Sequence, residues 1–192
     1  FVMEINLISD TVTRPTEGML QAMMQAKVGD DVFKQDHTVN ELEELVAEVF
    51  GMEAALFFPS GTMANQTAIK LLTQPGDELI ADHYAHIYNY EGGGIAFNSG
   101  AQVRAIQGQL GKITASQIED AIQAPIINLP RTSLVALENT LNKAGGGYYF
   151  LNEINPIAEL CKSKNLPLHL DGARIFNAIV ETKDATKDYS KY

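Results

Sequence analysis

An acid and a base, Asp171 and Arg174, come directly after the apolar run at residues 165–170. Charged side chains are costly to bury unless each has a partner. Asp171 could cap the segment that follows, or it could pair with Arg174. Alternatively, Asp171 could keep the ring nitrogen of a bound heterocycle protonated, which would leave Arg174 free to hold a carboxylate through two parallel hydrogen bonds. The motif alone leaves these interpretations open.

A second motif with chemical potential is Pro-Ser-Gly-Thr-Met-Ala-Asn-Gln at residues 59–66. Ser60, Gly61 and Thr62 would place backbone N–H groups and two hydroxyl groups at the N-terminus of a helix. Such a helix end favours an anion, for example a phosphate group. The competing interpretation is that Ser60 is an ordinary helix N-cap.

A third motif, residues 83–94, contains two histidines, three tyrosines and a run of glycines. Most histidines in such a segment are surface or packing residues. A flat imidazole such as that of His86 could also stack on a planar cofactor, or transfer a proton near pH 7.

The elements that must position these motifs can be read from the spacing of apolar residues. Thr114 and Gln117 form a capping box that predicts a helix start, and Gly51 predicts a helix end. The predicted helices are 39–50, 62–72, 113–124 and 154–165, and the predicted strands are 54–58, 77–82, 101–106, 133–139 and 166–171. Alternating strands and helices predict βαβ units, and therefore an α/β fold with a mostly parallel sheet. The three motifs follow predicted strands, and sites in such sheets lie beyond the carboxyl ends of the strands.

The composition of the chain argues against several classes of protein. The chain has 192 residues, of which 45% are apolar, and its formal net charge of −10 argues against a nucleic-acid or anionic-membrane partner. No apolar stretch approaches the roughly 20 residues of a membrane span. The first ten residues include Glu4 and Asp10 and lack the apolar core of a secretory signal. Cys161 is the only cysteine, which fits a reducing compartment, so we expect a cytoplasmic protein.

Six segments together resemble the L-threonine aldolases, which are pyridoxal-phosphate enzymes with the aspartate aminotransferase-like fold. They are residues 7–16, 29–33, 58–66, 85–91, 138–140 and 169–178. The resemblance extends from about Asn6 to Asn177. It implies a three-layer α/β sandwich in which residues 1–192 form an N-terminal arm and most of the large cofactor-binding domain. The family's C-terminal small domain would be absent from this chain.

The resemblance also implies a role for individual residues. Ser60, Gly61 and Thr62 would hold the cofactor phosphate, His86 would stack on the pyridine ring, and Asp171 would pair with the pyridinium nitrogen. Arg174 and Ser9 would hold the substrate carboxylate. No metal is implied. The implied reaction is cleavage of threonine, allo-threonine or a related β-hydroxy-α-amino acid to glycine and an aldehyde by a homodimer or homotetramer.

Two features depart from the family pattern. The family usually has histidine near the substrate hydroxyl where this chain has Leu141, so the base would be His86 or a water molecule. The family's Schiff-base lysine follows a strand roughly thirty residues beyond the aspartate that matches Asp171, so we expect it beyond Tyr192. Lys183, Lys187 and Lys191 lie in a polar stretch that looks like a solvated helix. The alternatives are therefore another lyase that catalyses β-elimination, or a fragment without catalytic activity.

Overall fold

The computed structural model describes residues 5–192; Glu4, which was used in the argument against a secretory signal, lies outside this range. The strands are β1 (Glu78–Asp82), β2 (Gln102–Ile106), β3 (Thr132–Glu138) and β4 (Leu168–Asp171). The α-helices are α1 (Glu17–Gln25), α2 (His37–Phe50), α3 (Gly61–Leu72), α4 (His86–Asn89), α5 (Ala115–Ala121), α6 (Leu151–Ser163) and α7 (Ile175–Thr182). Short 3-10 helices lie at Asp10–Val12, Asp31–Phe33, Asn142–Ala144 and Thr186–Lys191, and a π-helix at Ile95–Ser99.

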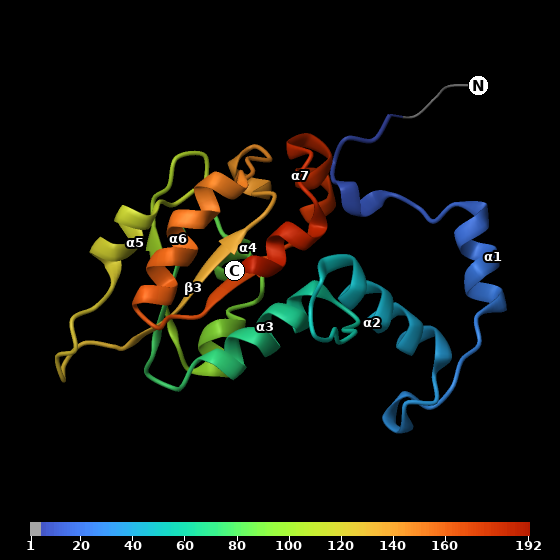
Figure 1. The fold of residues 1–192 in the computed structure, drawn as a ribbon, viewed down its shortest axis with the longest axis horizontal. Coiled ribbons are helices and arrows are strands. Elements are labelled where there is room, and N and C mark those ends of the chain that lie inside the picture. The colour runs from blue at the N-terminus through green and yellow to red at the C-terminus, as the bar shows by residue number, and fades with distance from the viewer. Residues whose placement is uncertain (1–4) are drawn as a thin grey trace.

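The strands form one sheet in the order β2-β1-β3-β4, and each neighbouring pair is parallel. This confirms the predicted α/β class and the parallel sheet (Figure 1). Glu138 of β3 lies beside Asp171 of β4 in the register, so both carboxylates stand at the carboxyl end of the sheet.

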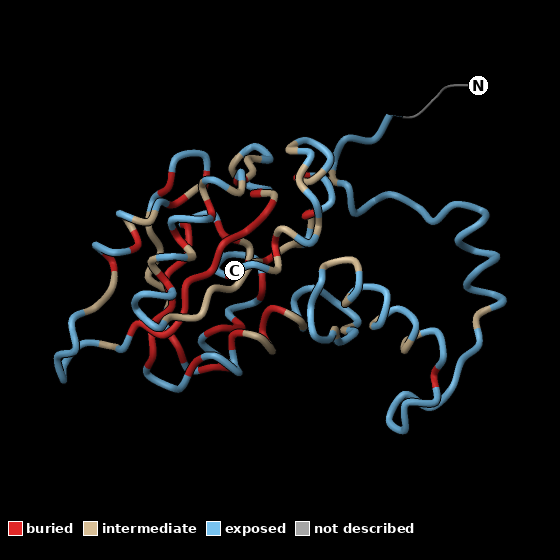
Figure 2. The backbone as a smooth tube through the Cα atoms, viewed as in Figure 1, coloured by how far each residue is buried: buried red, intermediate tan, exposed pale blue. Residues whose placement is uncertain are grey.

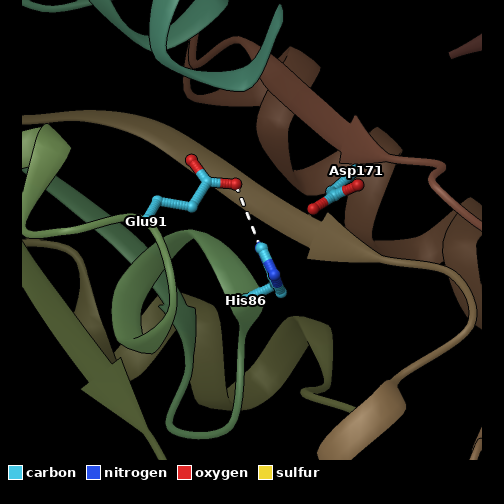
Figure 3. Close-up of side chains that lie close together, drawn as sticks. All are labelled: His86, Glu91 and Asp171. Atoms are coloured by element: carbon cyan, nitrogen blue, oxygen red, sulfur yellow. Dashed lines mark hydrogen bonds and ion pairs between the residues drawn. The ribbon is translucent and has the colours of Figure 1, made fainter. Parts of the chain in front are cut away.

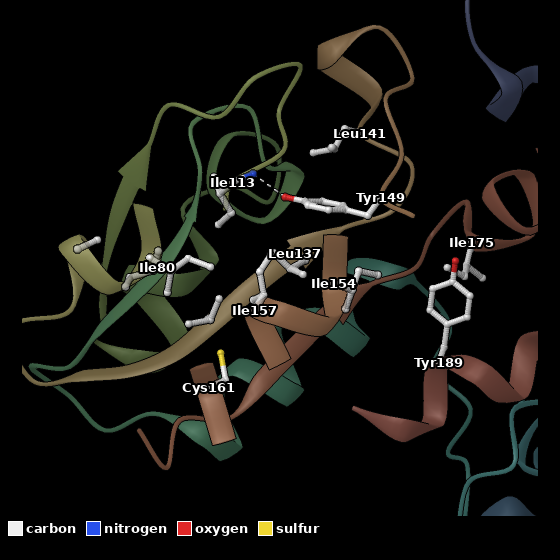
Figure 4. Packing of buried hydrophobic residues seen from close by; sticks show 13 residues of the cluster. Ile80, Ile113, Leu137, Leu141, Tyr149, Ile154, Ile157, Cys161, Ile175 and Tyr189 are labelled. Atoms are coloured by element: carbon white, nitrogen blue, oxygen red, sulfur yellow. Dashed lines mark hydrogen bonds between the residues drawn. The ribbon is translucent and has the colours of Figure 1, made fainter. Parts of the chain in front are cut away.

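The sheet is the middle of three layers. Alternate residues of a strand point to opposite faces. Val135 and Leu137 of β3 pack with α5 and α6 on one face, whereas Leu134 and Ala136 pack with α3 and α4 on the other. Figure 4 shows the first of these clusters, in which Ile154, Ile157 and Cys161 of α6 lie against the sheet. The predicted three-layer sandwich is therefore confirmed.

The predicted strand at 54–58 is wrong. This segment has no strand assignment and lies between α2 and α3. The amide of Phe57 donates a hydrogen bond to Glu43 Oε1 at 2.9 Å, where a strand residue would bond to a neighbouring strand. β4 is an edge strand among the described residues, and a mainly apolar groove of about 850 Å³ lies between it and this segment. Apolar sequence alone cannot form a strand without a partner backbone.

The first part of the chain is an extended arm. Helix α1 has no buried residue, and Figure 2 shows the arm exposed along most of its length. Helix α2 confirms the prediction at 39–50, and Gly51 ends it with a left-handed φ of 67°. Leu42, Leu45 and Val46 on its apolar face remain 41%, 56% and 38% exposed.

The polar stretch at the end of the chain differs from the expected solvated helix. Helix α7 ends at Thr182, a 3-10 helix follows at Thr186–Lys191, and Tyr189 within it is buried in the core. Lys183 and Lys191 make local hydrogen bonds to Val180 and Asp188. Within residues 5–192, no helix combines the length and the apolar character needed to cross a membrane.

Candidate functional site

Asp171 is the last residue of β4, and its side chain is buried at the carboxyl end of the sheet. Its Oδ1 accepts a hydrogen bond from the amide of Ala173 at 3.1 Å, so the carboxylate caps the turn that follows. Its Oδ2 accepts one from Nδ2 of Asn65 at 3.0 Å. The neighbour that pairs with Asp171 is therefore an amide from α3, and the proposed pairing with Arg174 is wrong.

Arg174 instead makes two hydrogen bonds to Asp10 in the N-terminal arm, 2.6 Å from Nε to Oδ2 and 2.8 Å from Nη2 to Oδ1. This guanidinium holds the pKa of Asp10 at about 2. Ser9 lies beside the pair, since its hydroxyl donates to Asp10 at 3.3 Å. Ser9 and Arg174 thus both contact Asp10, which is the carboxylate that the guanidinium holds here, and their binding of a substrate carboxylate remains a prediction.

Asn65 is the centre of a buried polar network that the sequence analysis missed. Its Nδ2 donates to Asp171 and, at 2.9 Å, to Oε1 of Glu91, and its Oδ1 lies 3.0 Å from Nε2 of His169. Because the asparagine oxygen only accepts, Nε2 of His169 carries the hydrogen. Burial lowers the pKa of His169, against the opposing effects of Asp171 and Glu91, which favours the neutral ring.

His86, the first residue of α4, and Glu91, in the loop after α4, complete this network. Figure 3 shows their side chains converging with Asp171 from separate parts of the chain. Nδ1 of His86 lies 3.1 Å from Oε1 of Glu91, and the backbone N–H of His86 donates to Oε2 of Glu138 at 2.8 Å. Burial raises the pKa of Glu138, and the nearby Asp171 adds to the effect. The predicted residues His86 and Asp171 therefore do lie at one site.

The same cluster has the spacing of a cation site. One ligand atom each from His86, Glu91 and Asp171 lies within 4.8 Å of the others. The carboxylate oxygens already accept hydrogen bonds from Asn65, which provides the compensation that buried carboxylates need. The prediction of no metal remains a prediction.

Ser60, Gly61 and Thr62 form the exposed N-terminus of α3. Ser60 Oγ accepts from the amide of Met63 at 3.1 Å, which confirms the interpretation of Ser60 as an N-cap. A side-chain carbon added at Gly61 would meet nothing within 4 Å, so the helix end is open to a ligand. Gly61 lines the same apolar groove as Asp171. Phosphate binding at this helix end remains a prediction.

Leu141, the residue that departs from the family pattern, does not contribute a polar group to the site. It is 1% exposed and belongs to the apolar cluster of Figure 4. A side-chain carbon added at Gly111 would lie 3.0 Å from its Cδ2, which shows how closely Leu141 packs there.

The sequence motifs contained these residues without revealing their role. Asn65 lies inside the motif at 59–66, as does Gln66, whose Nε2 donates to Glu91 at 2.6 Å, and Glu91 lies inside the motif at 83–94. The signal that could have found them is the presence of polar residues on elements that otherwise have to be buried.

The network makes Asn65→Asp a destabilising substitution. A third carboxylate would then lie between two buried ones and the donor amide would be gone, so we expect the free energy of unfolding to fall by about 3 kcal/mol. Denaturant-induced unfolding measures this change. Asn98→Asp is the matched control, because Asn98 is exposed and donates one 3.4 Å hydrogen bond. An equally small effect for both variants would contradict the network.

Comparison with known proteins agrees with the family resemblance found in the sequence. The profile of the family described as beta-eliminating lyase matches residues 6–192. The low specificity L-threonine aldolase of Escherichia coli strain K12 is 42% identical over 189 residues, which cover 98% of this chain and 56% of that protein. The probable low-specificity L-threonine aldolase 2 of Arabidopsis thaliana is 43% identical over 180 residues, covering 92% and 51%. A structure of Leishmania major threonine aldolase matches with a TM-score of 0.73 and 29% identity, covering 84% of this chain and 46% of that one. The chain spans about half the length of the curated relatives it matches.

Proposed function

This chain belongs to the beta-eliminating lyase family, a family of pyridoxal-phosphate-dependent enzymes, and from that premise we propose that the whole protein is an aldolase. Its substrate is threonine, allo-threonine or a related β-hydroxy-α-amino acid, and its products are glycine and an aldehyde. The observation that carries the proposal is the buried carboxylate of Asp171, at the carboxyl end of a parallel sheet and close to the imidazole of His86. The names of the most similar relatives support the aldolase reaction in particular.

The residues of the site fit pyridoxal phosphate by their chemistry. A carboxylate, an aromatic imidazole and an open helix N-terminus match a pyridinium nitrogen, a flat ring and a phosphate group. The bound cofactor supplies a ring that accepts the electrons released when the Cα–Cβ bond of the substrate breaks. Gly61 and Asp171 line one groove, which supports a single ligand reaching from the helix end to the strand end.

In this proposal each residue of the site has a defined binding role. Asp171 keeps the ring nitrogen protonated, and Asn65 and the amide of Ala173 hold the carboxylate in place. The helix end at Ser60, Gly61 and Thr62 binds the phosphate. Arg174 binds the substrate carboxylate with help from Ser9. Since Asp10 occupies Arg174 in this structure, the substrate carboxylate replaces that of Asp10 on the guanidinium.

A second candidate is β-elimination on the same scaffold. The buried, apolar Leu141 favours it, because the chain offers no imidazole at the position where the family usually has one. Product analysis separates the two reactions. Purified whole protein incubated with pyridoxal phosphate and threonine yields glycine and acetaldehyde if it is an aldolase, and ammonia with a 2-oxo acid if it is an eliminating enzyme. Absence of both sets of products would overturn the proposed function.

Several parts of the proposal concern the whole protein. Three of them stay predictions: the lysine that forms the Schiff base with the cofactor, the small domain, and assembly into a homodimer or homotetramer. The assignment of residues 1–192 to the arm and most of the large domain is part of the same proposal.

Arg174→Leu tests the carboxylate contact. We expect KM for threonine to rise about tenfold or more, because a bidentate charge-assisted interaction is lost, with a smaller change in kcat. Steady-state kinetics measure both constants. Arg131→Leu is the matched control, since Arg131 makes the same bidentate contact with Asp77 before the start of β1. A KM within twofold of the wild-type value for Arg174→Leu would contradict the assignment.

A further inference from the structure

The side chain of Glu91 is fully buried and accepts hydrogen bonds from three side chains. Nδ2 of Asn65 lies 2.9 Å from Oε1, Nε2 of Gln66 lies 2.6 Å from Oε2, and Nδ1 of His86 lies 3.1 Å from Oε1. Buried carboxylates are kept in proteins where donors compensate their desolvation. The carboxylate of Glu91 is therefore held in one position by three donors.

Close packing fixes this arrangement. A side-chain carbon added at Gly94 would lie 2.6 Å from Cδ of Gln66, so the backbone of this loop lies directly against the glutamine side chain. Glycine at 94 leaves Gln66 the room to reach Glu91. The carboxylate and its donors are held by the contact between α3 and the loop after α4.

The contact with Glu91 determines which nitrogen of His86 carries a hydrogen. An ionised carboxylate only accepts hydrogen bonds, so Nδ1 must be the donor. In the neutral ring, Nε2 then has a free lone pair. The His86 side chain is 36% exposed, whereas that of Glu91 is 0% exposed, so the ring has an open side as well as its buried contact.

We propose that Glu91 is a positioning residue that holds His86 in the Nδ1–H form, so that Nε2 accepts the proton of the substrate β-hydroxyl. This inference rests on the proposed function. In the step, the O–H bond breaks and its proton moves to Nε2, while its electron pair forms the second bond of the aldehyde C=O. The electron pair of the Cα–Cβ bond stays with the glycine half, which a solvent proton completes. Glu91 stabilises the imidazolium formed on the way, in the manner of the acid in a Ser-His-Asp triad.

The alternatives within the site are weaker. The side chain of Leu141 has no polar atom. In Glu138, Oε2 accepts from the backbone N–H of His86, and Oε1 lies 3.4 Å from the amide of Asn142. His169 is turned toward Asn65, with Nε2 as the donor. Among the described residues of the network, His86 is the one with both a fixed tautomer and an exposed side.

The test compares Glu91→Gln and Glu91→Leu with the wild type, using the whole protein. The first readout is independent of the cofactor: nitrogen NMR of ¹⁵N-histidine-labelled protein, with the His86 signals assigned by their loss in His86→Phe. We expect hydrogen on Nδ1 in the wild type. We also expect retention of that tautomer in Glu91→Gln, whose amide oxygen can accept, and its loss in Glu91→Leu.

The second readout is threonine cleavage. We expect kcat to fall about tenfold in Glu91→Gln and about a hundredfold in Glu91→Leu, with KM changed less than threefold. Glu78→Gln is the matched control, because Glu78 is also a buried glutamate but lies at the amino end of β1, away from the site. It accepts a hydrogen bond from Gln102 and forms an ion pair with Arg104. This substitution should leave both the tautomer and kcat unchanged.

The outcomes separate this inference from the proposed function. Hydrogen on Nε2 in the wild-type protein overturns the inference even if the Leu variant does not fold. Unchanged kcat in both Glu91 variants of a protein that cleaves threonine also overturns it and leaves the proposed function intact. A wild-type protein with the expected tautomer but no lyase activity overturns the proposed function, and with it the catalytic part of the inference.

Discussion

Asp171→Asn is expected to lower the kcat for threonine cleavage by the whole protein between about a hundredfold and a thousandfold. The amide has nearly the shape of the carboxylate, and its oxygen can still accept a hydrogen bond from Asn65 or Ala173, so the fold should remain. What is lost is the negative charge that keeps the cofactor ring nitrogen protonated and the ring able to accept electrons. Steady-state kinetics at saturating pyridoxal phosphate measure the effect.

The matched control is Asp82→Asn. Asp82 is the last residue of β1, is equally buried, and accepts hydrogen bonds from the amides of Tyr84 and Gly108, both at 2.8 Å. It is the same residue type at the same end of the same sheet, without contact to the network. We expect its kcat to stay within a few-fold of the wild-type value. Full activity of Asp171→Asn would show that the site is elsewhere.

His86→Phe is expected to lower kcat about a hundredfold while leaving the affinity for pyridoxal phosphate close to that of the wild type. Phenylalanine keeps a flat ring that can stack on the cofactor but has no nitrogen to accept a proton. His86→Ala removes the ring as well, so both the affinity and kcat should fall. Fluorescence titration with pyridoxal phosphate and steady-state kinetics separate the two effects.

His83→Phe is the control for this pair. His83 lies in the same loop and is exposed, with edge contacts to Tyr84 and Tyr88. Its substitution should change neither quantity. A fully active His86→Phe would assign the proton transfer to a water molecule, which was the other possibility that the sequence left open.

The strands that the sequence predicted correctly are those whose apolar residues pack, fully or partly buried, in the two apolar clusters beside the sheet. The residues 133–139 are an example, because every residue of β3 is buried. The segment 54–58 is equally apolar and failed, since a strand also depends on which backbone lies beside it. The spacing of apolar residues indicates which side chains are buried, but it does not indicate which backbone lies beside a segment.

Some residues of the candidate site could likewise be predicted from the sequence, and others could not. Asp171 and His86 could be found because Asp171 ends one predicted strand and His86 follows another, and the carboxyl ends of parallel strands lie at one edge of the sheet. For Asn65 and Glu91 the sequence offers only a weaker signal, a polar residue on an otherwise buried element, because their partners are set by the fold. Arg174 illustrates the point: its partner, Asp10, is 164 positions distant.

The hydrogen bond between Asn65 and Asp171 joins residues 106 positions apart, and it has a consequence for the order in which the molecule assembles. Parallel strands need a crossover between them, so the sheet cannot grow by local hairpins, and each distant contact costs chain entropy before it stabilises anything. Helix α3 and the loop with Glu91 precede β4 in the chain, so both leave the ribosome before Asp171 is available to join them. Within residues 5–192, this part of the site is therefore complete only when that distant contact has formed. Two of the donors that compensate the carboxylate of Glu91, Asn65 and Gln66, also precede β4 in the chain.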